Sequence, residues 1–287
     1  PLLTIVLAQL FGTSLWFSVN GVGLSLSRDL GVSEADLGRL TLTVQAGFIV
    51  GTLFIATTGL ADRFRASRIF AASCLAGALT NAVFVLAAAH PPHALLLRFA
   101  TGLCLAGIYP LGMKLVIGWT PRYTGAALAW LVGMLTLGTA LPHLLRGSTL
   151  GLPWEWSLLG ASILAVLGGI GIFVLGDGTH LPSSSGKTRV LDGLAALREP
   201  RFRAVAGGYF GHCWELYAFW TLTPFLVARE VARLGAAEAW VPWLSFTVIA
   251  LGFLGCVGGG QLSRRLGSLW GARRALAASG LICLVYP

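Results

Sequence analysis

Eight long apolar runs follow one another along this chain, separated by polar gaps, and they constrain its fold more than any other feature. A helix needs roughly 20 apolar residues to cross the hydrocarbon core of a bilayer. The runs that reach this length cover residues 2–26, 37–60, 69–89, 94–118, 124–145, 154–175, 203–227 and 240–262. We therefore expect an all-α polytopic membrane protein with eight full spans.

Both ends of the sequence fall inside apolar runs. Pro1 opens the first run without a basic leader, which is not the pattern of a cleavable signal peptide. A ninth run begins near Ala275 and stops at Pro287. We therefore expect part of a ninth span after the eight full ones, and a natural protein that is truncated here at both ends.

The amino-acid composition argues for a lipid environment. Hydrophobic residues make up 56% of the chain and charged residues only 11%, whereas soluble proteins carry about 25% charged residues. The net charge of +9 could suit nucleic acid, but the basic residues fall in gaps between the apolar runs. We therefore expect the lipid bilayer, and not nucleic acid, as the partner of this chain.

Basic residues between the runs predict the orientation, because cytoplasmic loops of membrane proteins carry an excess of Lys and Arg. With a cytoplasmic N-terminus, thirteen basic residues fall on the cytoplasmic side: Arg63, Arg65, Arg68, Arg122, Lys187, Arg189, Arg198, Arg201, Arg203, Arg264, Arg265, Arg273 and Arg274. Five fall on the other side: Arg28, Arg39, Arg146, Arg229 and Arg233. We expect a multi-pass protein of the cell membrane (inner or plasma membrane) with a cytoplasmic N-terminus.

The longest polar gap, residues 176–203, divides the chain into two parts. Its first half is rich in Ser, Gly and Pro, and six runs precede it. We expect residues 1–176 to form an N-terminal six-helix bundle and residues 203–287 a partial C-terminal bundle. Residues 177–202 are then a cytoplasmic linker between them.

A loop motif occurs between the second and third runs. Residues 57–68 read TTGLADRFRASR, and they resemble the motif G-x-L-A-D-R-x-G-R-R of the major facilitator superfamily. The positions that match are Leu60, Ala61, Asp62 and Arg63, while Thr58 and Arg65 stand where glycine is usual. After the eighth run, residues 260–268 read GQLSRRLGS and match the motif at Gly260, Leu262, Arg265 and Gly267, with Arg264 in place of the acid.

One loop signature that recurs in both halves is typical of an internal repeat. The resemblance covers essentially the whole chain, as about two-thirds of a twelve-helix transporter. It implies the fold of that superfamily, with a six-helix bundle followed by an incomplete one. It also implies a monomeric transporter that is not an enzyme, has no cofactor and carries a small-molecule substrate.

The resemblance also assigns roles to the loops. It implies that a latch of Asp62, Arg63, Arg65 and Arg265 holds the cytoplasmic side in one of two states. The alternative is that the arginines only mark topology, and Lys114, near the same end, is explained by snorkelling. In the fourth run, Arg98 and Gly102 resemble the family's fourth-helix motif. The fifth run, GMLTLGTALPHLL, resembles the antiporter motif only loosely, because that motif needs adjacent Gly and Pro.

Helical spacing places buried polar residues on shared faces. The stripes lie in the first, fourth and seventh runs, which correspond to cavity-lining helices of the superfamily. The expected substrate cavity consists of Gln9, Thr13, Trp16, Asn20, Arg98, Tyr109 and Phe219. Interhelical hydrogen bonding is the alternative explanation for the first stripe, and a structural role is the alternative for Arg98.

Glu215 is the one carboxylate deep within a run, and a charge at bilayer depth is expensive. Removal from water favours protonation of a carboxyl, and a nearby cation favours its release. We therefore expect Glu215 to couple proton movement to transport, with His212 sharing or relaying the proton. A fixed ion pair involving Glu215, or a simple interhelical hydrogen bond from His212, is the alternative.

The leading hypothesis is a secondary transporter that moves a small solute by alternating access and is coupled to protons. The alternatives are a nitrate-type anion carrier or a uniporter without proton coupling, and more remotely an intramembrane enzyme. His212 and Glu215 resemble only half of a metal site, because zinc needs three or four ligands. No GxxxxGK[ST] motif occurs, so we expect neither a metal nor nucleotide hydrolysis by that route.

Overall fold

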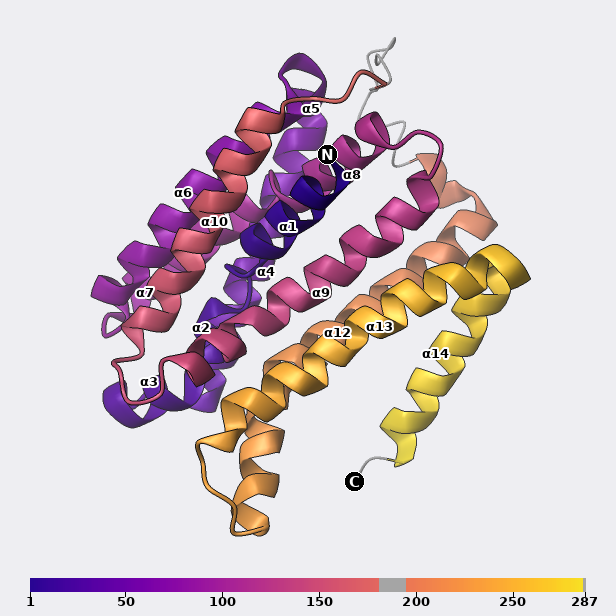
Figure 1. The fold of residues 1–287 in the computed structure, drawn as a ribbon. Coiled ribbons are helices and arrows are strands. Elements are labelled where there is room, and N and C mark those ends of the chain that lie inside the picture. The colour runs from indigo at the N-terminus through magenta and orange to yellow at the C-terminus, as the bar shows by residue number, and fades with distance from the viewer. Residues whose placement is uncertain (181–194, 286–287) are drawn as a thin grey trace.

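The computed structural model describes residues 1–180 and 195–285, and this part of the chain is helical without any strand (Figure 1). The first half contains α1 (Leu2–Thr13), α2 (Ser18–Gly21), α3 (Gly23–Leu30), α4 (Glu34–Thr58), α5 (Leu60–Arg63), α6 (Ala66–Ala87), α7 (Pro91–Leu105), α8 (Tyr109–Trp119), α9 (Thr124–Ser148) and α10 (Glu155–Leu175). The second half contains the 3-10 turn η1 (Ala196–Arg198), α12 (Pro200–Arg233), α13 (Trp240–Leu266) and α14 (Ser268–Val285). Most of the predicted linker, with Lys187 and Arg189, lies outside the described residues.

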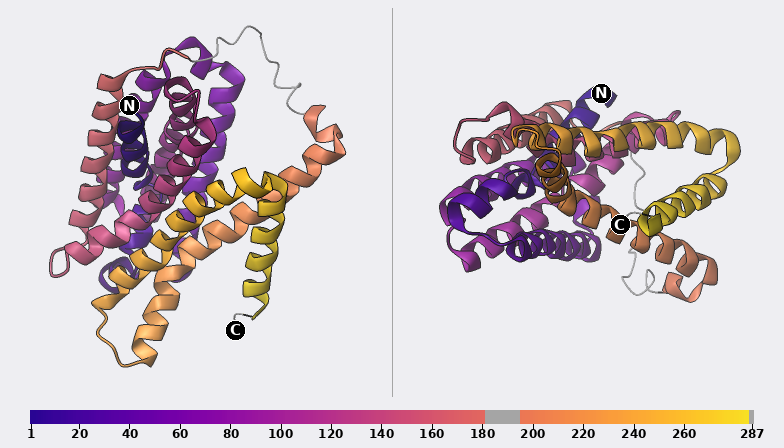
Figure 2. Two further views of the ribbon diagram at one scale, coloured as in Figure 1. Left: turned by 45° about the vertical axis from the view of Figure 1, so that its right-hand side comes forward. Right: turned by 90° about the horizontal axis from the view of Figure 1, so that it is seen from below.

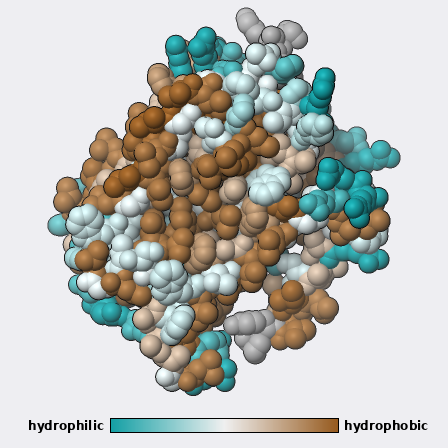
Figure 3. All heavy atoms as spheres, viewed as in Figure 1, coloured by the Kyte–Doolittle hydropathy of each residue, from teal (hydrophilic) through white to brown (hydrophobic). Residues whose placement is uncertain are grey.

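The all-α polytopic prediction is confirmed. Six helical segments of the described chain are long and apolar enough to cross a membrane: Glu34–Thr58, Ala66–Ala87, Pro91–Trp119, Thr124–Ser148, Glu155–Leu175 and Trp240–Leu266. They correspond to six of the eight predicted runs. The other two runs are also helical. Helix α1 is short, and the mean hydropathy of α12 is lowered by glycines, tyrosines, His212 and Glu215. Figure 3 shows the resulting surface, with hydrophobic side chains across the middle of this face and hydrophilic ones toward its edges.

The expectation of one continuous helix over residues 2–26 is wrong. Helix α1 ends at Thr13, a turn follows, and α2 and α3 are separated at Val22. Side-chain hydroxyls donate hydrogen bonds to the backbone carbonyls around this break: Thr13 to Gln9 O (2.7 Å), Ser14 to Phe11 O (2.6 Å) and Ser18 to Leu15 O (3.1 Å). Such local bonds compete with the regular helix ladder, and the apolar pattern of the run does not reveal them.

Helices α4 and α7 cross closely because small residues face each other there. A Cβ added to Gly47 would collide with the backbone of Phe99, and one added to Gly102 would collide with the backbone of Val44. At Gly51, the same atom would lie 2.9 Å from the carbonyl oxygen of Leu103. Small residues let membrane helices approach until their backbones are in contact. Helix α6 packs against both α7 and α10, and α1 packs against α9 and α10.

The second half joins the first through α13, which packs along α9 (Figure 2). Small residues allow this approach as well, since a Cβ at Gly260 would lie 2.6 Å from the Cβ of Ala129. Helix α12 packs on α13 and touches α2 and α3. We name the two ends of the molecule after residues that lie there. The Arg28 end carries α3 and the α12–α13 connection, and the Asp62 end carries α5 and the α13–α14 connection.

Candidate functional site

The polar residues of α1 lie inside the first half of the molecule. Gln9 is fully buried, and neither atom of its side-chain amide has a hydrogen-bond partner among the described residues. It packs against Gly112 of α8, where any larger residue would collide with its amide oxygen. Thr13 is also fully buried, and it packs against Gly138 of α9. These two residues therefore face helices of their own bundle.

Trp16 and Asn20 follow the break in α1, and both interact with α4. The indole of Trp16 donates to Oε1 of Gln45 (3.1 Å), and the amide of Asn20 donates to the hydroxyl of Thr41 (3.0 Å). The break redirects these two side chains, so the predicted stripe from Gln9 to Asn20 does not form one continuous face.

An aromatic cluster connects the break in α1 with α12. It consists of Trp16, Phe17, Phe48, Tyr217 and Trp220. The ring centroids of Trp16 and Tyr217 are 5.9 Å apart, and those of Phe17 and Trp220 are 5.4 Å apart in an edge-to-face arrangement. Trp16, Phe17 and Trp220 are buried. Such aromatic pairs stabilise a contact beyond their buried area, so this cluster fixes α12 to the first half.

Arg98 is fully buried, and it binds the break in α1. Its guanidinium donates to Leu15 O (3.2 Å) and Trp16 O (2.6 Å), and it also contacts Ser18 Oγ (3.3 Å) and Asn81 Oδ1 (3.5 Å). None of these partners is a carboxylate. The structure therefore does not bring Arg98 and Glu215 together. Arg98 instead supplies donors to carbonyls that the interrupted helix leaves free.

Tyr109, the first residue of α8, is half-buried and packs against the same core. It belongs to the first half, as do Gln9, Thr13, Trp16 and Arg98. Phe219, the remaining residue of the predicted cavity, is 43% exposed on α12. The predicted cavity residues are therefore distributed over several separate contacts.

Glu215, His212 and Phe219 line one groove, of about 860 Å³, between α12 and α14. Glu215 is half-buried, and it accepts hydrogen bonds from the hydroxyl of Ser279 and from the thiol of Cys283 (3.5 Å). Both partners lie on α14. Sequence reasoning missed them, although their spacing of four residues places them on one helix face.

Asp62 of the predicted latch pairs with Lys114 of α8, with 3.0 Å between Oδ1 and Nζ. The ammonium group of Lys114 also donates to the carbonyl of Ala61. Snorkelling therefore does not explain Lys114, because it binds the motif loop. Arg63, Arg65 and Arg265 are exposed. Asp62 and Lys114 are 52 positions apart in the sequence, so local pattern could not predict that they pair.

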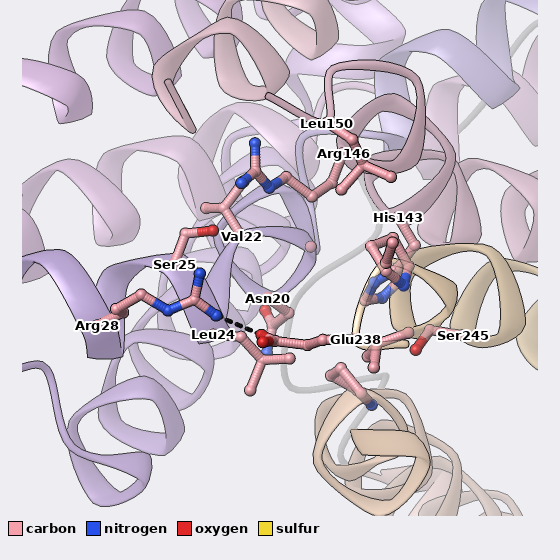
Figure 4. Close-up of a pocket in the computed structure, with 15 residues that line it drawn as sticks. Asn20, Val22, Leu24, Ser25, Arg28, His143, Arg146, Leu150, Glu238 and Ser245 are labelled. Atoms are coloured by element: carbon pink, nitrogen blue, oxygen red, sulfur yellow. Dashed lines mark hydrogen bonds and ion pairs between the residues drawn. The ribbon is translucent and has the colours of Figure 1, made fainter. Parts of the chain in front are cut away.

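A cavity of about 190 Å³ lies at the Arg28 end, between the two halves (Figure 4). Arg28 of α3 and Glu238, just before α13, form an ion pair across it. His143 of α9 and Ser245 of α13 also line it. No motif or helical stripe in the sequence points to Glu238, His143 or Ser245 as functional residues.

The helical architecture and the apolar spans define a polytopic helical membrane protein. The chain belongs to the Major Facilitator Superfamily, whose profile matches residues 4–287. A similar solved structure is the bacterial homologue of the human lysosomal transporter Spinster, in an inward-facing and unoccupied conformation, with a TM-score of 0.64 and 18% sequence identity. The similarity covers 92% of this chain and 62% of that one, so the chain spans less than two-thirds of its length. No curated protein matches this sequence.

Proposed function

We propose that the protein containing this chain is a secondary transporter that moves a small solute across the cell membrane by alternating access. The observation that carries the proposal is the contact between the halves. They meet along α9 and α13, through the aromatic cluster, and through the Arg28–Glu238 pair at one end. Alternating access requires two bodies that separate at either end in turn. The Arg28–Glu238 pair lies at one end only, and such a contact can open while the halves stay joined along α9 and α13.

The Arg28 end is the closed one. The aromatic cluster and the Arg28–Glu238 pair lie toward this end, whereas the residues of α12 from Arg201 to Val205 are exposed at the other. The similar Spinster homologue is described as inward-facing. We assign the same state here, with the Asp62 end in the cytoplasm, which agrees with the orientation that the basic residues predict.

We assign proton coupling to Glu215, with His212 one turn away on the same groove. The partners of Glu215, Ser279 and Cys283, are a hydroxyl and a thiol. A hydroxyl can donate to a carboxylate and accept from a protonated carboxyl. These neutral partners therefore support both protonation states, whereas a fixed ion pair would hold the carboxylate charged.

Proteoliposomes that contain the full-length protein and enclose a pH-sensitive dye test this assignment. A panel of anionic, sugar-like and cationic amphipathic solutes is added to wild type and to Glu215→Gln. We expect one solute class to change the internal pH with wild type and not with the variant. The matched control is Glu34→Gln, because Glu34 is an exposed carboxylate in the first turn of α4 and does not line this groove.

Three other results would contradict parts of the proposal. If labelled solute crosses without any pH change in wild type, the protein is a uniporter or uses another ion, and Glu215 is structural. If neither solute nor protons cross under any condition, the transporter assignment itself fails. If Glu215→Gln carries solute and changes the internal pH like wild type, then another residue couples transport to protons.

A further inference from the structure

The cavity at the Arg28 end contains buried polar groups that have no hydrogen-bond partner among residues 1–180 and 195–285. Nε2 of His143 and Oγ of Ser245 have no hydrogen-bond partner in the described part of the chain. His143 is 1% exposed and Ser245 is fully buried, so bulk water does not satisfy them. A buried polar group without a partner is costly. Two of them on opposite halves of the molecule, lining one cavity, indicate a place for a ligand.

The charges around this cavity favour an anion. Two guanidinium groups, those of Arg28 and Arg146, line it together with one carboxylate, that of Glu238. Arg146 uses only Nη1 in its hydrogen bonds to Leu152 O (3.0 Å) and Thr149 O (3.4 Å). A guanidinium has five N–H donors, so donors remain for a ligand. Figure 4 shows the two guanidinium groups on one side of the cavity, with His143 and Ser245 on the other.

The size and remaining lining of the cavity limit the ligand further. A cavity of ~150 Å³ accommodates a benzene-sized molecule, and this one measures about 190 Å³. Apolar side chains complete its wall: Val22, Leu24, Leu150, Pro224, Val241 and Pro242. A small organic anion with one charged and one apolar end matches this combination better than an inorganic ion does.

We propose that this cavity is a binding site for a small organic monocarboxylate, distinct from the groove of Glu215. The ligand carboxylate accepts hydrogen bonds from Ser245 and His143, and it competes with Glu238 for the guanidinium of Arg28. Its apolar end lies against the valine, leucine and proline side chains. Arg28 and Glu238 belong to different halves of the molecule. A ligand that displaces Glu238 therefore breaks the ion pair that joins the two halves at this end. The binding step itself does not depend on transport.

Binding of labelled benzoate to the purified full-length protein in detergent tests the site, with benzamide as the neutral probe of the same shape. We expect benzoate to bind and benzamide to bind at least tenfold more weakly. Ser245→Ala should weaken benzoate binding about tenfold, because a hydrogen bond to a charged group is lost. Glu238→Gln should strengthen it severalfold, since Arg28 then has no competing carboxylate.

The matched control is Ser148→Ala, because Ser148 lies on α9 outside the cavity and donates to Leu144 O (2.9 Å). This variant should bind benzoate like wild type. Absence of benzoate binding, or equal binding of benzamide, would overturn the proposal. So would benzoate binding that Ser245→Ala and Glu238→Gln leave unchanged, because the anion would then sit elsewhere, for example beside Glu215. Melting curves of each variant without ligand separate loss of binding from loss of folding.

Discussion

At the scale of single residues, Arg98 shows how a charge can be accommodated inside a membrane bundle. It is fully buried, and its partners are two backbone carbonyls and the neutral side chains of Ser18 and Asn81. The carbonyls belong to the break after α1, where the helix ladder no longer supplies donors. A planar guanidinium can serve several acceptors at once, which an ammonium cannot do in the same geometry. Arg98 therefore stabilises the break in α1.

We expect Arg98→Leu to lower the free energy of unfolding by about 3 kcal/mol, because it leaves buried acceptors without donors. Arg98→Lys should lose less, since it keeps one donor group. Thermal unfolding in detergent, followed by tryptophan fluorescence, measures both. Arg63→Leu, at an exposed position, is the control and should unfold like wild type. An unchanged midpoint for Arg98→Leu would exclude this structural role.

At the scale of helices, close packing depends on where a glycine faces its neighbour. Gly47 and Gly38 both lie on α4, but their surroundings differ. A Cβ at Gly47 would collide with the backbone of Phe99 on α7, whereas nothing lies within 4 Å of a Cβ at Gly38. Backbone atoms cannot rotate away as a flexible side chain can, so the collision at Gly47 would have to separate the helices.

We therefore expect Gly47→Ala to destabilise the protein by about 2 kcal/mol, as overpacking does. Gly38→Ala should instead stabilise it by about 0.5 kcal/mol, because alanine favours the helix and restricts the unfolded chain. Unfolding midpoints of the two purified variants compare these effects within one helix. Equal effects of the two substitutions would show that α4 and α7 do not pack through these glycines.

At the scale of the whole molecule, the Arg28 end is where the two halves must part if the protein alternates its access. Arg28 and Glu238 face each other there, and both side chains are more than half exposed. An exposed ion pair contributes only about 0.2–1 kcal/mol. Such a contact can close this end and still be broken readily during a transport cycle.

A covalent link at this position tests the cycle directly. Arg28→Cys and Glu238→Cys are combined in a full-length protein whose five native cysteines are replaced by serine or alanine. A short bifunctional thiol reagent should link the pair and abolish solute uptake into proteoliposomes, and cleavage of the linker should restore uptake. Each single variant, treated in the same way, should keep its activity. Full uptake with complete cross-linking would exclude opening at this end.

Much of this architecture could be predicted from the sequence, because lipid imposes length and polarity on every span. Six of the eight apolar runs correspond to helices that can cross a membrane. The motif around Asp62 placed the chain in the superfamily to which it belongs. Residues 37–60 also contain Gly47 and Gly51, whose spacing of four positions puts both on one helix face. These inferences depend only on local pattern, so they did not need the tertiary structure.

The contacts between distant positions could not be predicted in this way. Periodicity places Arg98 and Glu215 inside helices, but it cannot show that Arg98 binds the α1 break while Glu215 meets Ser279 of α14. The hydroxyl bonds that interrupt residues 2–26 involve side chains that also fit a regular helix.

The sequence by itself therefore determined the family, the helical class and most of the spans, because bilayer thickness and backbone hydrogen bonding act on each segment separately. Only the tertiary structure decided that Asp62 meets Lys114 and Arg28 meets Glu238, and that His143 and Ser245 line one cavity. Pairing in space depends on how helices pack against one another, and close packing is a property of the whole assembly rather than of any one segment.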